Sequence, residues 1–328
     1  MKRLGVVGAG AWGTALAHTA CRSGLEVCLW AHEPETAAAI NEAHENKPFL
    51  PGLPLDPALQ ATTDLARVCD ADAVLLTTPA QVLRTVCQNL APHWTAGVPA
   101  VICSKGIETA TGALMTQVVT ESLLHAPIAV LSGPSFAGEV ARGLPTAVTL
   151  ACADEALGQT IAEALGNPAF RTYWSTDVIG AQLGGSVKNV LAIACGIVEG
   201  RGMGDNARAA LVTRGLAEMS RLAVALGARP ETLMGLSGLG DLVLTANAMQ
   251  SRNFSFGVQL GQGQTVQQIL DSRTAVTEGV HTAAAVAALA EQLAIDLPIC
   301  QAADAVLNRG ADLNATITAL LSRPLTKE

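Results

Sequence analysis

A glycine-rich turn close to the amino terminus limits the possible folds of this chain more than any other feature. Gly8, Gly10 and Gly13 stand directly after an apolar run at residues 4–7 and open a helix-forming segment at residues 14–22. In such a unit the first glycine permits a tight turn, the second lets the backbone approach a pyrophosphate, and the third lets the helix pack closely against the strand. The spacing therefore predicts a dinucleotide-binding site. The alternative is a glycine-rich turn that binds nothing.

Short apolar runs of the kind that form buried strands recur through the first half of the chain. Segments long enough for helices separate them, and they lie at residues 4–7, 27–30, 73–76, 100–103 and 128–131. This alternation predicts a parallel, doubly wound α/β sheet, which two later runs at residues 147–152 and 170–174 extend. The longer interval after the second run contains Pro48, Pro51, Pro54 and Pro57, and we expect an ordered loop or a lid there.

The pattern changes after Thr176 and Asp177, which are suited to begin a helix. Strand-like runs end at this point, and long segments rich in Ala, Leu and Val continue to the carboxyl terminus. We therefore expect a Rossmann-like, doubly wound α/β domain over residues 1–178, followed by an all-α domain over residues 179–328.

Composition excludes several classes of protein. The chain is 50% hydrophobic and 15% charged, which is too apolar for a disordered protein. Its formal net charge of -8 has the wrong sign for binding nucleic acid. No apolar run reaches the roughly 18 uninterrupted residues typical of a membrane-spanning helix, so we expect no membrane span.

The eight cysteines are scattered, without any Cys-x-x-Cys pair. This pattern predicts no metal site and a reducing, cytoplasmic environment. Lys2 and Arg3, followed by an apolar stretch that reaches Cys21, imitate a secretion signal. The glycines of that stretch are poorly suited to a signal sequence and fit the strand and helix described above, so we expect the segment to be part of the folded domain.

The residues after the second strand bear on cofactor choice. In sites that select NAD, an acidic side chain usually ends this strand and binds the ribose hydroxyls. Here Ala31 and His32 come first, and Glu33 follows. We therefore expect either NADP or NAD to bind, with NADPH slightly favoured. Alternatively, His32 is an ordinary surface histidine.

Two predicted strands end in polar groups that suit an anion. Lys105 follows the run at residues 100–103, and Gly133 and Ser135 follow the run that ends at residue 131. Ligands of doubly wound sheets bind at the carboxyl ends of the strands, so these residues are candidates for contacts with a ligand. The alternative for Lys105 is a solvated lysine in a loop.

Lys188 is one of only five lysines, and it lies on the first helix of the second half. The residues three and four positions away are Gly184, Gly185, Leu191 and Ala192, so its ammonium rises from a small, apolar face. A partly desolvated ammonium suits proton donation, with the glycines making room for a nicotinamide or a substrate. The alternative is a side chain that extends to solvent.

Two loops of the second half add further polar groups. Asp241 follows a Gly-Leu-Gly turn, where its carboxylate can orient a hydroxyl group or Lys188. Ser251, Arg252 and Asn253 precede another helical run, and a helix start with an arginine beside it is a good phosphate site. Simple helix capping is the alternative for both groups.

With these residues in view, the chain resembles bacterial NAD(P)-dependent glycerol-3-phosphate dehydrogenases along essentially its whole length. The resemblance rests on many ordered motifs at compatible spacing. They are GAGAWGTALA at 8–17, FLPG at 49–52, SKGIE at 104–108, LSGPSFAGEVARGLPTA at 131–147, GGSVKNVLAIACGI at 184–197, NARAALVTRGLAEMSRL at 206–222, GLGDLVLT at 238–245 and QSRNFSFG at 250–257.

The resemblance implies reversible reduction of dihydroxyacetone phosphate to sn-glycerol 3-phosphate, the backbone precursor of phospholipids, by a cytoplasmic homodimer. It also implies that the lysine of the VKN motif, here Lys188, is the general acid and base. The substrate contacts that it implies come from Lys105, Gly133, Ser135, Lys188, Asp241, Ser251, Arg252 and Asn253. The implied cofactor contacts, beside the three glycines, come from Ala11, Trp12, His32, Lys105, Ala137, Arg252, Val276 and Glu278.

The chain departs from the family pattern in two places. Many relatives carry a hydroxyl group where Ala11 stands, and a basic residue soon after the SRN triplet, where this chain has Phe254 and Ser255. Ala11 keeps its backbone N–H, so we expect cofactor binding to persist. The phosphate end of the site is expected to be less positive than usual.

Two rival functions fit part of the same pattern. A dehydrogenase of the β-hydroxyacid type shares the fold and the lysine but acts on a carboxylate, and the SRN triplet at a helix start argues against it. A regulator that senses a dinucleotide without catalysis needs the glycine turn, but it has no need of Lys188 in an apolar groove.

Overall fold

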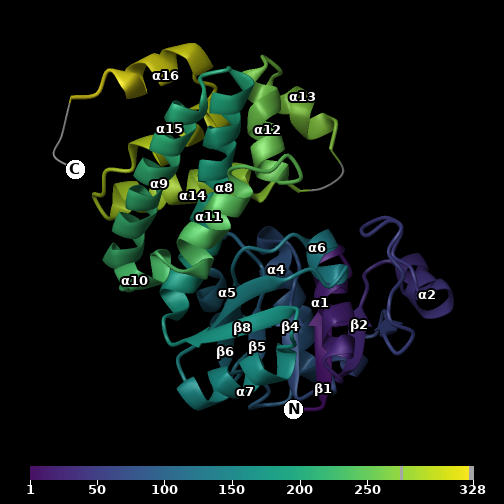
Figure 1. Cartoon of the computed structure of the whole chain (residues 1–328). Coiled ribbons are helices and arrows are strands. Elements are labelled where there is room, and N and C mark those ends of the chain that lie inside the picture. Colours follow the sequence, from purple (N-terminus) through teal and green to yellow (C-terminus); the bar gives the residue numbers. More distant parts are fainter. Residues whose placement is uncertain (274–275, 325–328) are drawn as a thin grey trace. The chain divides into compact units, whose positions relative to one another are not determined.

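The computed structural model describes residues 1–273 and 276–324. The chain divides into two compact units. The first contains Met1–Lys105 and Ala113–Gln182, and the second contains Gly106–Gly112 and the chain from Leu183 onward (Figure 1). The division falls inside helix α8 (Val178–Gly200). The domain boundary expected at residue 178 stays a prediction.

The first unit is built on one eight-stranded sheet with the order β3-β2-β1-β4-β5-β6-β7-β8. Every predicted run forms a strand, and the carboxyl ends of β1, β2, β4, β5 and β6 lie at one edge because these strands are parallel. The order reverses between β1 and β4, where ligands of such sheets bind. The strands are β1 (Arg3–Val7), β2 (Glu26–Trp30), β3 (Gln60–Thr62), β4 (Ala73–Leu76), β5 (Ala100–Ile102), β6 (Ile128–Ser132), β7 (Thr146–Cys152) and β8 (Phe170–Ser175).

The sheet is parallel, as predicted for the first five runs, except at one place, because β7 runs antiparallel to β6. The connection between them contains only the five-residue helix α6 (Ala137–Ala141), so the chain turns back without a long crossover helix. The short strand β3 was not predicted. The proline-rich loop at residues 48–57 is confirmed, since it contains no helix.

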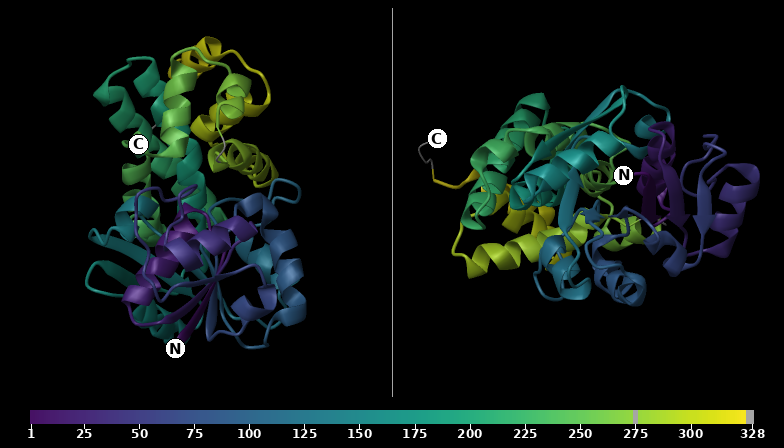
Figure 2. Two further views of the ribbon diagram at one scale, coloured as in Figure 1. Left: turned by 90° about the vertical axis from the view of Figure 1, so that its right-hand side faces the viewer. Right: turned by 90° about the horizontal axis from the view of Figure 1, so that it is seen from below.

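Alternate residues of the strands supply two hydrophobic cores, one on each face of the sheet. On one face, Leu4 and Val6 of β1 belong to a core shared with α1, α2, α6 and α7. On the other face, Val7 belongs to a core shared with α3, α4, α5 and the first turn of α8. Figure 2 shows the strands of this unit running between helices. Beside α6 and α8, these helices are α1 (Ala11–Arg22), α2 (Pro34–Ala43), α3 (Leu65–Cys69), α4 (Leu83–Leu90), α5 (Met115–Ser122) and α7 (Glu155–Leu165).

From Leu183 onward, the described part of the second unit is helical, as predicted. The first of its helices, α8, begins where expected, because Asp177 Oδ1 accepts a hydrogen bond of 2.9 Å from the backbone N–H of Gly180. Beyond α8 the helices are α9 (Asp205–Ala225), α10 (Pro230–Leu233), the π-turn η3 (Leu236–Gly240), α11 (Asp241–Thr245), α12 (Arg252–Gly261), α13 (Val266–Asp271), α14 (Glu278–Gln292), α15 (Pro298–Asn308) and α16 (Leu313–Leu321).

Helices α8 and α12 cross at backbone contact, and glycines make this possible. A Cβ on Gly196 of α8 would lie 2.1 Å from the Phe254 carbonyl oxygen, and one on Gly257 of α12 would lie 2.0 Å from the Ile193 oxygen. No larger residue fits such a crossing without movement of a helix. The crossing fixes the start of α12 relative to the middle of α8.

Among the described residues, α8 is the one helix long and apolar enough to cross a membrane. Of its most apolar window, 89% is buried inside the protein. A buried core helix passes the same test of length and composition, so this helix is weak evidence for a membrane span.

Candidate active site

The glycine turn has the geometry that its spacing predicts. Gly8 has a φ of +115°, which favours glycine, and a Cβ on Gly13 would lie 1.9 Å from the Gly8 carbonyl oxygen. Gly10 is different, because it has an ordinary φ of -67° and a Cβ there would meet no atom within 4 Å. Neither backbone strain nor packing therefore requires glycine at residue 10, and the open space suits a ligand.

The start of α1 offers hydrogen-bond donors to that space. In the part of the chain that the structure describes, the backbone N–H groups of Ala11, Trp12 and Gly13 have no acceptor. Such N–H groups at a helix start bind phosphate. Asn46, which sequence reasoning missed, holds the turn by donating 2.8 Å hydrogen bonds to the Ala9 carbonyl oxygen and to Thr14 Oγ1. These features fit the pyrophosphate of a dinucleotide.

A hollow of about 240 Å³ lies at the carboxyl end of β2. His32 is exposed, and the centroid of its ring is 5.8 Å from that of Trp30. None of the lining side chains is a carboxylate, so the hollow itself has no group that repels a 2'-phosphate. The residues that line it are Trp30, His32, Leu65, Val82, Thr85, Val86 and Asn89.

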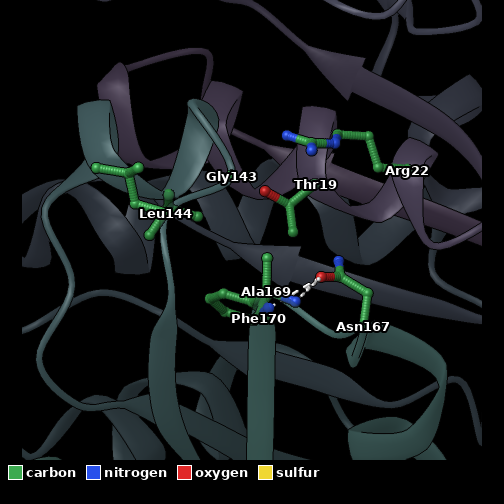
Figure 3. Close-up of a pocket in the computed structure, with 8 residues that line it drawn as sticks. Thr19, Arg22, Gly143, Leu144, Asn167, Ala169 and Phe170 are labelled. Carbon is green, nitrogen blue, oxygen red and sulfur yellow. Dashed lines mark hydrogen bonds between the residues drawn. The ribbon is translucent and has the colours of Figure 1, made fainter.

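A second hollow, shown in Figure 3, has a different character. It encloses only about 10 Å³, which is at most the space of one water molecule. Thr19 and Arg22, from the last turns of α1, face Asn167, whose Oδ1 accepts hydrogen bonds from the backbone N–H groups of Ala169 and Phe170 (Figure 3). This small hollow is a feature of packing and not a ligand site.

The residues after β5 and β6 come together, as expected for neighbouring parallel strands. Lys105 Nζ and Ser135 Oγ each donate a 3.1 Å hydrogen bond to the carbonyl oxygen of Gly133. Gly133 has a φ of +143°, and a Cβ there would lie 2.9 Å from Val148 Cα. Ala137 is the first residue of α6. Lys105 is therefore tied to the backbone of the neighbouring loop.

Lys188 and Asp241 form a buried ion pair. Lys188 Nζ lies 2.6 Å from Asp241 Oδ1 and donates a second hydrogen bond, of 2.7 Å, to Thr245 Oγ1. Lys188 is 7% exposed and Asp241 is fully buried. The ammonium is therefore directed inward and does not extend to solvent. The carboxylate of Asp241 orients Lys188, as one of the sequence interpretations held.

Gly184, one of the two glycines near Lys188, does not have the role expected from the sequence. A Cβ on Gly184 would lie 2.4 Å from the carbonyl oxygen of Ser237. Gly184 therefore makes room for the backbone of η3, and not for a nicotinamide or a substrate. This close approach brings η3, and with it the start of α11, against α8.

Ser251, Arg252 and Asn253 begin α12, where one side chain caps the helix and two backbone N–H groups have no acceptor among the described residues. Ser251 Oγ accepts a 3.2 Å hydrogen bond from the Phe254 N–H and so caps the helix. The Arg252 side chain is exposed and has no hydrogen-bond partner among the described residues, and the N–H groups of Arg252 and Asn253 have no acceptor there. Two backbone donors and a guanidinium at a helix start suit an anion.

The side chain of Asn253 links three helices. Its Nδ2 donates a 2.9 Å hydrogen bond to Asn189 Oδ1 on α8, and its Oδ1 accepts a 3.0 Å bond from the Gly279 N–H in the first turn of α14. Glu278 is the first residue of α14, and Val276 is 41% exposed. Because Asn189 follows Lys188 on α8, this link holds the start of α12 against the part of α8 that carries Lys188.

Three residues that hold the candidate site residues in place were not predicted from the sequence. Thr245 stands four residues after Asp241, which places both on one face of a helix, so the spacing was an available signal. Asn189 and Asn46 gave no comparable signal, because their partners are distant in the chain. No cluster of potential metal ligands occurs among residues 1–273 and 276–324.

Comparison with known proteins identifies the family. The family model described as the N-terminus of NAD-dependent glycerol-3-phosphate dehydrogenase matches residues 3–158, and the model of its C-terminus matches residues 177–318. A glycerol-3-phosphate dehydrogenase (NAD(P)+) of Rhodospirillum rubrum is 61% identical over 326 residues, which cover 99% of this chain and 93% of the relative. A relative of the same name from Caulobacter vibrioides is 59% identical, covering 100% of this chain and 99% of its own.

A solved structure agrees with these sequence matches. The glycerol-3-phosphate dehydrogenase of Coxiella burnetii is 39% identical, has a TM-score of 0.93, and is matched over 98% of this chain and 99% of its own. The agreement extends over both the α/β and the helical parts of the chain. The chain therefore belongs to the NAD-dependent glycerol-3-phosphate dehydrogenase family.

Proposed function

We propose that this protein catalyses the reversible reduction of dihydroxyacetone phosphate to sn-glycerol 3-phosphate with NADPH or NADH, and so supplies the backbone of phospholipids. Membership of the family supports the reaction. The observation that carries the proposal is the buried Lys188 ammonium, which Asp241 and Thr245 hold on α8, the helix that Asn189 joins to the start of α12.

The residues present fit a dinucleotide. The open N–H groups at the start of α1 and the space beside Gly10 suit the pyrophosphate, and the hollow beside His32 suits the adenosine end. Without a carboxylate in that hollow, a 2'-phosphate is accommodated, so NADPH is slightly favoured. The nicotinamide, when bound, supplies the hydride. The remaining cofactor contacts are assigned by family resemblance to Lys105, Ala137, Arg252, Val276 and Glu278.

Lys188 acts as general acid in reduction and as general base in oxidation. As the ketone carbon of dihydroxyacetone phosphate gains a hydride, negative charge develops on its oxygen. An ammonium beside that oxygen stabilises the charge and then donates a proton from Nζ. Asp241 and Thr245 accept hydrogen bonds from Nζ and so hold the ammonium in a fixed position.

The phosphate of the substrate is assigned to the start of α12. Arg252 contributes a guanidinium, and the N–H groups of Arg252 and Asn253 donate to phosphate oxygens. Ser251 and Asn253 keep this turn in place through the contacts described above. Lys105, Gly133 and Ser135 are assigned to the substrate by the family resemblance alone.

We further propose that the enzyme is a cytoplasmic homodimer without a membrane span and without a nucleic-acid partner. The family resemblance supports the dimer and the location. The net charge of -8 supports the absence of nucleic acid, because binding of polyanions requires positive charge.

A spectrophotometric assay tests the proposed reaction. Purified protein is mixed with NADPH or NADH and dihydroxyacetone phosphate, and oxidation of the nicotinamide is followed. We expect turnover with both cofactors. A 2-oxo acid serves as the comparison substrate, and preference for it would favour the β-hydroxyacid alternative. Absence of turnover with every ketone would contradict the proposal and favour a regulator.

A further inference from the structure

Arg273, which follows α13 in the chain, is bound to the first turns of α12. Its Nη1 donates a 2.7 Å hydrogen bond to the carbonyl oxygen of Arg252. Its Nη2 donates bonds of 3.2 Å to Ser255 Oγ and 2.7 Å to Gln259 Oε1. The guanidinium also lies 5.4 Å from the centre of the Phe256 ring. These contacts fix a half-buried cation against the helix start that carries Arg252.

The two arginines form a concentration of positive charge. Burial, together with the nearby Arg252 guanidinium, lowers the pKa of Arg273. In the described part of the chain, neither arginine forms an ion pair with a carboxylate. The open N–H groups of Arg252 and Asn253 add to this positive region. Repulsion between the two guanidinium groups would be relieved by an anion at the start of α12.

We propose that Arg273 is a positioning residue of the phosphate site, which holds the backbone of Arg252 in place and adds a second positive charge beside it. The inference rests on the proposed function, since the anion it invokes is the phosphate of dihydroxyacetone phosphate. Both Nη atoms are engaged by α12, so Arg273 acts through Arg252 and through its charge, not through a direct contact. The guanidinium of Arg273 lies beside Ser255, at a point of the chain where many relatives carry a basic residue.

Two substitutions separate the effect of the positive charge of Arg273 from the effect of its planar, forked guanidinium. Arg273→Gln removes the charge, and Arg273→Lys keeps it without the fork. We expect Arg273→Gln to raise the KM for dihydroxyacetone phosphate by about fivefold or more, with little change in kcat, and Arg273→Lys to recover part of the loss. The Kd for NADPH, measured by fluorescence titration, should stay within about twofold of the wild-type value.

Two controls separate a role in phosphate binding from a merely structural one. Dihydroxyacetone without phosphate is the first, and its kcat/KM should be the same in the wild type and in Arg273→Gln. Arg221→Gln on α9 is the second, because Arg221 also donates to a backbone carbonyl, that of Asp296. This control should leave the KM for dihydroxyacetone phosphate unchanged.

The outcomes distinguish the inference from the function on which it rests. An unchanged KM for dihydroxyacetone phosphate in Arg273→Gln, or an equal loss with dihydroxyacetone, would overturn the inference while leaving the proposed function in place. A wild-type protein without turnover of dihydroxyacetone phosphate would overturn the proposed function, and the inference with it.

Discussion

The ammonium of Lys188 is bound by two oxygen atoms that come from one turn of a helix. Asp241 and Thr245 lie 53 and 57 residues further along the chain, and both accept hydrogen bonds from its Nζ. From the position of Lys188 on an apolar, glycine-lined face, the sequence predicted a functional role for its ammonium. It also indicated Asp241 as a possible partner. It did not predict Thr245, nor that Gly184 serves helix packing, because both depend on how η3 and α11 meet α8.

The exposed ring of His32 gives a test of cofactor choice. Replacing it by aspartate places a carboxylate at the end of β2, where it would repel a 2'-phosphate and accept hydrogen bonds from ribose hydroxyls. We expect His32→Asp to lower the ratio of kcat/KM for NADPH to that for NADH several-fold. His93→Asp, at another exposed histidine of the same unit, is the control. A wild-type enzyme strongly selective for NADH would contradict this interpretation.

Arg252 gives a test of the phosphate site. A charge-assisted hydrogen bond contributes about 1.5–3 kcal/mol, so Arg252→Ala should raise the KM for dihydroxyacetone phosphate by roughly tenfold or more. Lysine is a point charge without the fork of arginine, and Arg252→Lys should restore only part of the affinity. Steady-state kinetics and NADPH titration measure both effects. Unchanged affinity for substrate and cofactor in Arg252→Ala would remove Arg252 from the site.

At the scale of elements, the crossing of α8 and α12 decides where the start of α12 lies. Gly196 and Gly200 of α8 meet Gly257 and Gly261 of α12, with the two backbones in contact. Asn253 then bonds to Asn189 on the same pair of helices. The helical character of both segments was predicted, but four glycines on two segments distant in the chain do not show that the two helices face one another.

Gly257→Ala tests the importance of this crossing. The added methyl group would lie 2.0 Å from the Ile193 oxygen, so the helices must separate. We expect a loss of about 1–3 kcal/mol in the free energy of unfolding, seen as a lower Tm, and a higher KM for dihydroxyacetone phosphate. Gly138→Ala is the matched control for Tm, since a Cβ at this helical position meets nothing within 4 Å. Equal Tm values for the two variants would contradict the account.

The strands of the sheet were more predictable than their directions. Runs such as residues 73–76 are apolar on both faces, which is the mark of a buried strand. The direction of β7 was missed because a strand reads the same in either direction, and only the shortness of α6 shows that no crossover occurs. The strand β3 was missed because its three residues, Gln60–Thr62, carry no apolar run.

For the whole molecule, the assignment depends on both units together. The glycine turn of the first unit predicts a dinucleotide but no particular reaction, since many dehydrogenases share it. The second unit adds an ammonium that can donate a proton and a helix start that suits phosphate. Neither the link through Asn253 nor the position of Arg273 could be predicted from sequence, because each joins segments far apart in the chain.

Turnover by a variant without the Lys188 ammonium tests whether Lys188 donates the proton. Lys188→Met keeps an apolar stem but leaves the buried Asp241 carboxylate without its cation, which destabilises the fold. Lys188→Met/Asp241→Asn removes both charges and serves as a second variant. Thermal unfolding and NADPH titration then establish that each variant is folded and binds cofactor.

The decisive measurement is kcat for dihydroxyacetone phosphate with NADPH at saturation. We predict a fall of about 10² to 10⁴ in both kcat and kcat/KM for each folded variant, the usual contribution of a positioned general acid. A folded Lys188→Met enzyme that keeps most of its kcat and only binds substrate less tightly would contradict the account. Lys188 would then be an anchor for the substrate, and Lys105 would be the next candidate for the acid.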